Sequence, residues 1–269
     1  MSIKDGRKTL EEIEKEIKVK RIGEIHFNNI GESFEIIDYN GTHNTTVKTS
    51  NGNILYNCDY SNLKIGNIKD YMNPTIFGLG FYGGKKSTIR EYPYCIWFRM
   101  MERCYSDSPI IRKRQRFYDG CTVSEEWHNY QNYKKWYYDN LWTDDFKLCV
   151  DKDILFKGNR IYGEEHCTLV PYKINNLFVK SDCVRGACPI GVSKTPNGKF
   201  RAYCNKEING KKKQICLGTY IDMEEAFLKY KQFKENYIKE VANEYKSKYQ
   251  NFPQKLYDAL YSYQVERTD

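Results

Sequence analysis

The segment from residue 190 to residue 245 constrains the fold more than any other part of the chain. Apolar and polar residues alternate in FRAYCN (200–205), and INGKKK (208–213) has the composition of a hairpin turn leading into QICL (214–217). The pattern predicts three short antiparallel strands with one apolar and one cationic face. In the helix that follows, apolar residues recur at intervals of three and four, which covers the apolar face of the sheet. These residues are Ala226, Tyr230, Phe233, Tyr237, Val241 and Tyr245. The other face is free for a polyanion, although an ordinary module with a solvated sheet face fits the same pattern.

Four short motifs follow one another in this segment: GV (191–192), GKF (198–200), LGTY (217–220) and an acidic helix start, EEA (224–226). Over residues 190–242 they resemble the APETALA/ethylene-response-factor DNA-binding domain, which inserts its three-stranded sheet into the major groove. The resemblance implies that the outward strand positions contact DNA. Where that family carries mostly arginine and tryptophan, this chain has Ser193, Thr195, Asn197, Tyr203, Asn205, Gln214 and Cys216.

An arginine that bonds both acceptors of guanine is the commonest specific contact in the major groove, and these positions lack it. We therefore expect the lysines and Arg201 to supply mainly attraction to phosphates, with weak or altered readout of base sequence. A second cationic run, RKRQR (112–116), fits a solvated loop and also a phosphate clamp. The predicted DNA contacts are Lys194, Lys199, Arg201, Tyr203, Asn205, Lys211, Lys212, Lys213, Gln214, Arg112, Lys113 and Arg114.

The charge balance agrees with an anionic partner. The 269 residues carry a formal net charge of +8, from 43 Lys and Arg against 35 Asp and Glu, which favours nucleic acid or an anionic surface. Aromatic residues make up 15% of the chain, with 24 tyrosines, which is typical of a folded protein whose tyrosines mostly pack in cores. No apolar run is long enough to span a bilayer and the N-terminus lacks the apolar core of a signal peptide, so we expect a cytoplasmic protein.

The ten cysteines are scattered and include no CxxC pair. In a reducing compartment, scattered cysteines mostly serve as small buried apolar residues. We therefore expect neither a disulfide framework nor a structural zinc site.

Changes in pattern predict an α+β protein with three parts, at residues 1–88, 89–180 and 186–269. Residues 8–20 predict a charged amphipathic helix, whose narrow apolar stripe is expected to dock on the body of the protein or on a partner. From residue 23 to residue 82, short alternating runs separated by NG, GT and NP predict a small antiparallel β barrel. The stretch GLGFYGGKK (78–86) lacks the GxxxxGK[ST] pattern and is therefore not a phosphate-binding loop.

The middle of the chain predicts a mixture of helices and strands. YCIWFRMMERCY (94–105) and residues 129–141 have helical periodicity, and YDGCTVSEEW (118–127) is typical of a strand. The tryptophans and tyrosines of these helices are expected in the core. Near the C-terminus, a short helix begins after Pro253, and its apolar stripe is expected to pack back on the long helix.

Three longer motifs occupy this middle part: W..M..RC (97–104), Y.GC.V.EEW (118–127) and VDKDI..KGN..Y....C..VP..IN (150–175). Together they resemble phage and mobile-element proteins related to HNH homing endonucleases, often followed by an APETALA-type domain. With the C-terminal segment, the resemblance covers residues 94–245. It implies a β-hairpin and helix of the ββα-metal kind that hold one divalent cation, Mg²⁺ or Mn²⁺, beside a general base. Matched to that family, Asp151 is the first metal ligand, Lys152 stands at the general-base position, His166 at the central position, and Asn175 is the last metal ligand.

The lysine puts cleavage in question, because lysine is normally protonated near neutral pH and then accepts no proton. In one interpretation Asp153 or His166 supplies another base, and the protein is a metal-dependent nickase or endonuclease. In a second, the scaffold has kept DNA binding and lost cleavage. In a third, Asp151 and Asp153 are surface carboxylates paired with Lys152 or Arg160.

The resemblance therefore favours a phage or mobile-element protein that binds double-stranded DNA and carries a degraded HNH-like site. The alternative is a non-catalytic protein that uses the nuclease-like scaffold. Such a protein would act in the host cytoplasm, as a DNA-bound regulator or as a phage-encoded inhibitor that binds a host defence protein.

Overall fold

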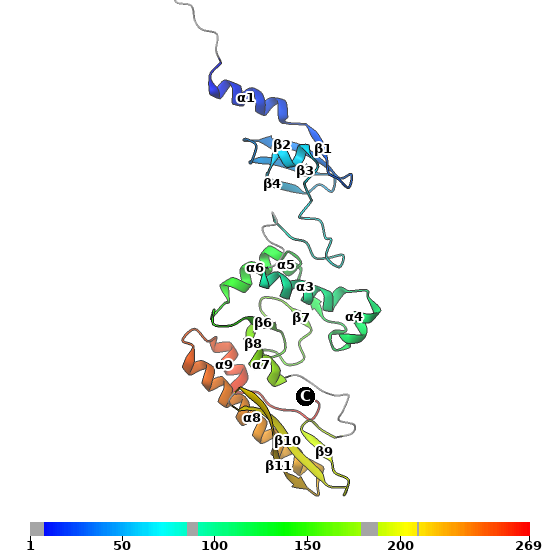
Figure 1. Ribbon diagram of the computed structural model, residues 1–269, viewed down its shortest axis with the longest axis vertical. Helices are drawn as coiled ribbons and strands as arrows, with labels where there is room; N and C mark the ends of the chain where they lie inside the picture. The colour runs from blue at the N-terminus through cyan, green and yellow to red at the C-terminus, as the bar shows by residue number, and fades with distance from the viewer. Residues whose placement is uncertain (1–7, 85–90, 179–187, 209) are drawn as a thin grey trace, which may run out of the picture. The chain divides into compact units, whose positions relative to one another are not determined.

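The computed structural model describes residues 8–84, 91–178, 188–208 and 210–269. The predicted domain limits at 88, 89, 180 and 186, and Cys183, lie outside the described residues. Helices and several small sheets alternate along the chain, which confirms the α+β class (Figure 1).

The chain forms two compact units. The first comprises Met1–Arg112 and Glu125–Tyr133, and the second comprises Lys113–Ser124 and Lys134–Asp269. In the part of the chain that the structure describes, the helices are all too short or too polar to cross a membrane.

The first unit begins with an exposed helix, α1 (Leu10–Arg21). It starts at a capping box, in which the side chains of Thr9 and Glu12 each accept a hydrogen bond from the backbone N–H of the other. No residue of α1 is buried, and Leu10 is 80% exposed. The described residues therefore leave the apolar stripe open to solvent, and its predicted docking on the body of the protein is not found.

Four strands follow α1 and form one antiparallel sheet. They pair in the order β1 (Ile25–Phe27), β2 (Ser33–Tyr39), β3 (Thr45–Thr49), β4 (Ile54–Cys58). A core of Phe34, Ile36, Val47, Leu55 and Leu63 lies on one face, and Leu63 comes from the short helix α2 (Tyr60–Lys64). Among the described residues the sheet stays open, so the predicted barrel is wrong. Closure requires tilted strands long enough for the last to reach the first, whereas β1 has three residues.

Aromatic side chains form the core of the helical part of the first unit. α3 (Tyr92–Tyr105) buries Trp97, whose indole N–H donates to the carbonyl oxygen of Trp127 at 2.6 Å. Tyr130, at the start of α6 (Tyr130–Asp139), is also buried, with its ring centroid 5.4 Å from that of Trp97. The two predicted helices and their aromatic core are confirmed.

The cationic run at 112–116 is largely helical. Its first three residues belong to α4 (Pro109–Arg114), and a 3-10 turn, η1 (Arg116–Tyr118), follows. Proline opens α4, where its missing N–H has no helical acceptor to lose. Arg112, Lys113 and Arg114 are exposed, so the predicted loop is wrong, while the predicted phosphate clamp stays a prediction.

The second unit contains two small strand pairs. β5 (Thr122–Val123) runs parallel to β7 (Ile161–Tyr162), and β6 (Leu148–Asp151) runs antiparallel to β8 (Thr168–Pro171). The strand predicted at 118–127 is thus confirmed over two residues, because helix α5 (Glu125–His128) takes up its second half. β8 leads directly into α7 (Tyr172–Asn175) and the 3-10 turn η2 (Asn176–Phe178).

The C-terminal part matches its prediction closely. Three antiparallel strands pair in the order β11 (Lys211–Tyr220), β10 (Phe200–Ile208), β9 (Val192–Lys194), and the long helix α8 (Met223–Lys248) lies along them (Figure 1). The core between sheet and helix includes Val192, Ala202, Cys204, Phe227 and Tyr230.

The last helix, α9 (Gln254–Tyr261), begins after Pro253 as predicted. It packs on α8 and buries Leu256 and Leu260. The predicted packing back of this helix is confirmed.

Candidate functional site

The register of the C-terminal strands determines which predicted DNA contacts share one face. Residues directly opposite each other in antiparallel strands point to the same side of the sheet, and successive residues alternate. Because the even-numbered residues of β10 form part of the core against α8, Arg201, Tyr203 and Asn205 point away from α8. Asn205 lies opposite Gln214, so these two side-chain amides are neighbours on that outer face.

The three consecutive lysines of β11 divide between the two faces. Lys212 lies opposite Glu207 and shares the outer face, whereas Lys213 lies opposite Lys206, whose ammonium bonds to α8. Lys211 has the same parity as Lys213 and also lies on the α8 side. All three side chains are exposed, but only one belongs to the outer face.

Lys194 and Lys199 also divide between the faces. Lys194 lies opposite Phe200, which packs on the core, so it belongs to the α8 side. Lys199 precedes Arg201 by two residues and continues the outer face beyond the start of β10. We call this outer surface the polar face, and it consists of Lys199, Arg201, Tyr203, Asn205, Lys212 and Gln214. Apart from Tyr203, which is half-buried, these residues are exposed.

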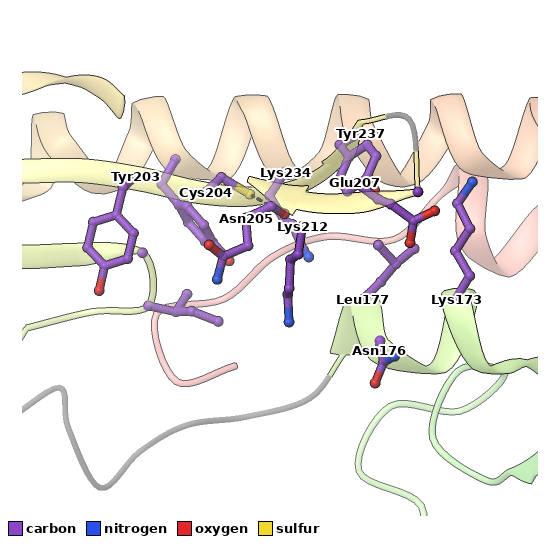
Figure 2. A pocket seen from close by; sticks show the side chains of 14 residues that line it. Lys173, Asn176, Leu177, Tyr203, Cys204, Asn205, Glu207, Lys212, Lys234 and Tyr237 are labelled. Atoms are coloured by element: carbon purple, nitrogen blue, oxygen red, sulfur yellow. Dashed lines mark hydrogen bonds between the residues drawn. The ribbon is translucent and has the colours of Figure 1, made fainter. Parts of the chain in front are cut away.

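A cavity of about 390 Å³ lies at the end of the polar face nearest the β10–β11 turn. Tyr203, Asn205 and Lys212 point from the sheet to the side on which Asn176 and Leu177 lie (Figure 2). Its lining therefore joins the polar face to the turn that follows α7.

Asp151, the first predicted metal ligand, ends β6. One carboxylate oxygen, Oδ1, accepts the backbone N–H of Asp153 and of Ile154, each at 2.8 Å. Its second oxygen, Oδ2, has no hydrogen-bond partner in the described ranges. Burial raises the pKa of Asp151, because it removes water from the carboxylate, although the two N–H groups act in the opposite direction. The carboxylate thus holds the start of the loop and presents one free oxygen.

Lys152, at the predicted general-base position, is buried with 6% of its surface exposed. Its ammonium donates to both carboxylate oxygens of Asp153, at 2.8 and 2.9 Å, and to the carbonyl oxygen of Asn159 at 2.6 Å. The amide of Asn159 donates in return to the carbonyls of Lys152 and Ile161, at 2.9 and 2.8 Å. We call this arrangement the Lys152 clasp. It closes the loop from 152 to 160, and Lys152 acts in it as a donor, which is the role opposite to that of a base.

Asn159 is a structural residue that the sequence interpretation did not identify. Its signal was the GN pair at 158–159, which is typical of a turn whose Asn side chain bonds nearby backbone. The pairing of Asp153 with Lys152 agrees with part of the third interpretation above. The third interpretation also named Arg160 as a partner of the two carboxylates, but Arg160 donates to the carbonyl oxygen of Asp119.

His166 and Asn175 lie at either end of the segment that contains β8. The half-buried ring of His166 lies 5.9 Å from that of Phe156, centroid to centroid. Asn175 is the last residue of α7. No group of three or more His, Cys, Asp and Glu side chains placed to hold a metal is found across the described ranges, so the ligand roles of Asp151 and Asn175 stay predictions.

Comparison with known proteins adds no further constraint on this site. No family model matches the sequence, and neither the curated proteins nor the solved structures give a match.

Proposed function

We propose that the protein binds double-stranded DNA through the polar face of its C-terminal sheet. The observation that carries this proposal is the strand register, which gathers Arg201, Asn205 and Gln214 on one exposed face while α8 covers the other. A two-stranded β-ribbon such as β10 and β11 fits the width of the major groove. The net charge of +8 supports the same partner.

The side chains of the polar face suit two kinds of contact. Lys199, Arg201 and Lys212 attract phosphates and fix the position of the sheet on the duplex. The neighbouring amides of Asn205 and Gln214 have the donor and acceptor pair that matches N6 and N7 of adenine. We therefore propose readout that favours A·T over G·C pairs, without the arginine–guanine contact.

The first test compares two double variants that each remove two positive charges from the same sheet. Lys199→Ser with Arg201→Ser changes the polar face, and the matched control, Lys211→Ser with Lys213→Ser, changes the α8 side. We expect the polar-face variant to bind a labelled duplex about 30-fold more weakly near 0.1 M salt, and to lower the slope of log K against log salt by about two. Fluorescence anisotropy measures both quantities.

The control variant is expected to bind within about threefold of the unchanged protein, since charges on the other side of a sheet make few phosphate contacts. Equal losses of affinity in the two variants would show that positive charges on both sides of the sheet contribute equally to DNA binding. In that case the proposed orientation of the sheet is wrong.

Metal-dependent cleavage is the second candidate, and the order of elements around Asp151 supports it. An antiparallel strand pair, β6 and β8, followed directly by α7 is the ββα order that the resemblance to HNH endonucleases implies. With Mg²⁺ or Mn²⁺ bound, Asp151 and Asn175 would be its protein ligands, and the ion would stabilise charge on the scissile phosphate. His166 would then be the candidate base. The Lys152 clasp argues against this function, because it fills the base position with a donor.

The alternative is a non-catalytic phage or mobile-element protein that regulates while bound to DNA or inhibits a host defence protein. A plasmid assay separates it from the nuclease. Purified protein is incubated with supercoiled plasmid and Mg²⁺ or Mn²⁺, beside Asp151→Asn with His166→Ala, a pair chosen because Asn keeps an oxygen acceptor for the two backbone N–H groups. If the protein is a nuclease, it nicks the plasmid, and the double variant nicks it at least about 100-fold more slowly.

The control for the plasmid assay is Asp144→Asn with His128→Ala, which makes the same chemical changes at residues outside the 150–175 motif. Nicking by all three proteins would indicate a contaminating nuclease. Intact plasmid throughout would contradict the nuclease and favour the non-catalytic alternative.

A further inference from the structure

The cavity beside the polar face exists because β9 is shorter than β10. β9 pairs with β10 only as far as the Val192–Ala202 pair, and one more hydrogen bond, from Tyr203 N–H to the carbonyl of Gly191 at 2.9 Å, continues the edge. β10 then extends to Ile208. On that open side the described residues place α8 and the turn after α7 as walls of the cavity (Figure 2).

Three lysines line the cavity, and two of them lack a carboxylate partner among the described residues. Lys173 is paired with Glu244 at 2.9 Å, whereas neither Lys212 nor Lys234 forms an ion pair within the described part of the chain. Burial and, to a lesser extent, the charge of Lys212 lower the pKa of Lys234. Glu207 also lines the cavity, but within the described part of the chain it forms no ion pair with either lysine. The two lysines outnumber this one carboxylate, so the cavity favours a ligand that supplies negative charge.

The remaining lining indicates more than a bare anion. Tyr203 presents an aromatic ring and Asn205 an amide, and both point to the cavity side of the strands (Figure 2). An aromatic ring on which a base stacks and an amide that bonds a base edge are the usual partners of an unstacked nucleotide. The volume of about 390 Å³ falls within the roughly 300–1,000 Å³ of small-molecule sites.

We propose that this cavity binds one nucleotide, with its phosphate between Lys212 and Lys234 and its base against Tyr203. The nucleotide comes either from the DNA on the polar face or from solution as a free mononucleotide. Only the first source rests on the proposed DNA binding, and the second stands without it.

The test titrates deoxyadenosine monophosphate, and separately a short duplex, into the full-length protein by isothermal calorimetry. Lys234→Met removes one cavity charge and keeps an unbranched side chain that is one atom shorter. Because that charge is poorly solvated, the substitution is expected to leave the fold intact, which the thermal melt checks. The matched control is Lys229→Met, an exposed lysine of the same helix outside the cavity.

We expect Lys234→Met to weaken mononucleotide binding at least about tenfold, while Lys229→Met leaves it unchanged. If only duplex binding falls in Lys234→Met, the nucleotide belongs to the DNA. If neither ligand responds to Lys234→Met, or both lysine variants lose binding equally, the proposed site is wrong. Mononucleotide binding by a protein that does not bind the duplex would keep this site and reject the proposed DNA binding. Tyr203→Ala is a second variant, and it changes no charge. If the base packs against the ring of Tyr203, this variant is also expected to bind the mononucleotide more weakly.

Discussion

A Gly191→Ala variant is expected to lose most of the stability of the C-terminal sheet. Gly191 has a φ of +74°, which strains any other residue by about 1–2 kcal/mol. A methyl group at this position would also overlap the ring of Tyr230, which is buried in the core between sheet and helix. Either the ring leaves the core or β9 moves away, and overpacking of this kind adds about 1–3 kcal/mol or more.

Amide hydrogen exchange measures the loss in this part of the chain alone. A total of about 2–5 kcal/mol corresponds to exchange of the β10 amides that is faster by about 30-fold or more. The matched control is Gly198→Ala, at a φ of +77° with no atom within 4 Å of the new methyl group, where strain alone is expected. Equal effects at the two glycines would contradict the contact between Gly191 and Tyr230. Adding Tyr230→Ala to Gly191→Ala is expected to cost less than the sum of the two changes.

Lys152→Met is expected to destabilise the loop after β6 by about 2–4 kcal/mol. The substitution keeps the apolar stem but removes the ammonium that joins Asp153 to the carbonyl of Asn159. Removing one partner of a buried ion pair costs about 3–5 kcal/mol of stability. The carboxylate of Asp153 is half-exposed, so its hydration offsets part of this loss. Amide hydrogen exchange of residues 148–162 measures the change, because tryptophan fluorescence would report on both units.

Two further variants separate the Lys152 clasp from a general effect of charge. Lys135→Met breaks an exposed Lys–Asp pair within α6 and is expected to leave unfolding unchanged. Asp153→Asn alone is expected to lower the stability of the loop. In a protein that already carries Lys152→Met, it is expected to cause little further loss, because the ion pair is already broken. A Lys152→Met protein as stable as the original would mean that the lysine is free for another role.

The sequence predicted the C-terminal part well because its local signals agree with one another. Alternation in β10, the spacing of Tyr230 and Tyr237 in α8, and Pro253 before α9 each indicate one structure, and packing enforces the same one. Strands of two residues, such as β5, are too short to show an alternation of apolar and polar residues. Their pairing partners lie far along the chain, so the pattern of 118–127 could not show where the strand ends.

The sequence identified candidate residues but not the face of the sheet or the burial of each one. Lys211, Lys212 and Lys213 are equivalent in the sequence, and only the register with β10 separates them. The burial of Lys152 depends on contacts with Asn159 and with Tyr162, whose ring centroid lies 5.9 Å from the ammonium, and neither contact follows from periodicity. The cavity beside Lys234 depends on where β9 stops, which is a property of the packed sheet.

The Lys152 clasp also affects how this chain can evolve. If an ancestor carried a histidine base at this position, as the HNH resemblance implies, exchanging the lysine back to histidine would remove the ammonium that ties Asp153 to the backbone at Asn159. The reversal would give an unstable loop before it gave a base. Recovery of cleavage would need a second, earlier substitution that closes the loop in another way. On that premise, a histidine at this position would be two substitutions away from the present sequence, and the intermediate with only the histidine would be less stable than either end state.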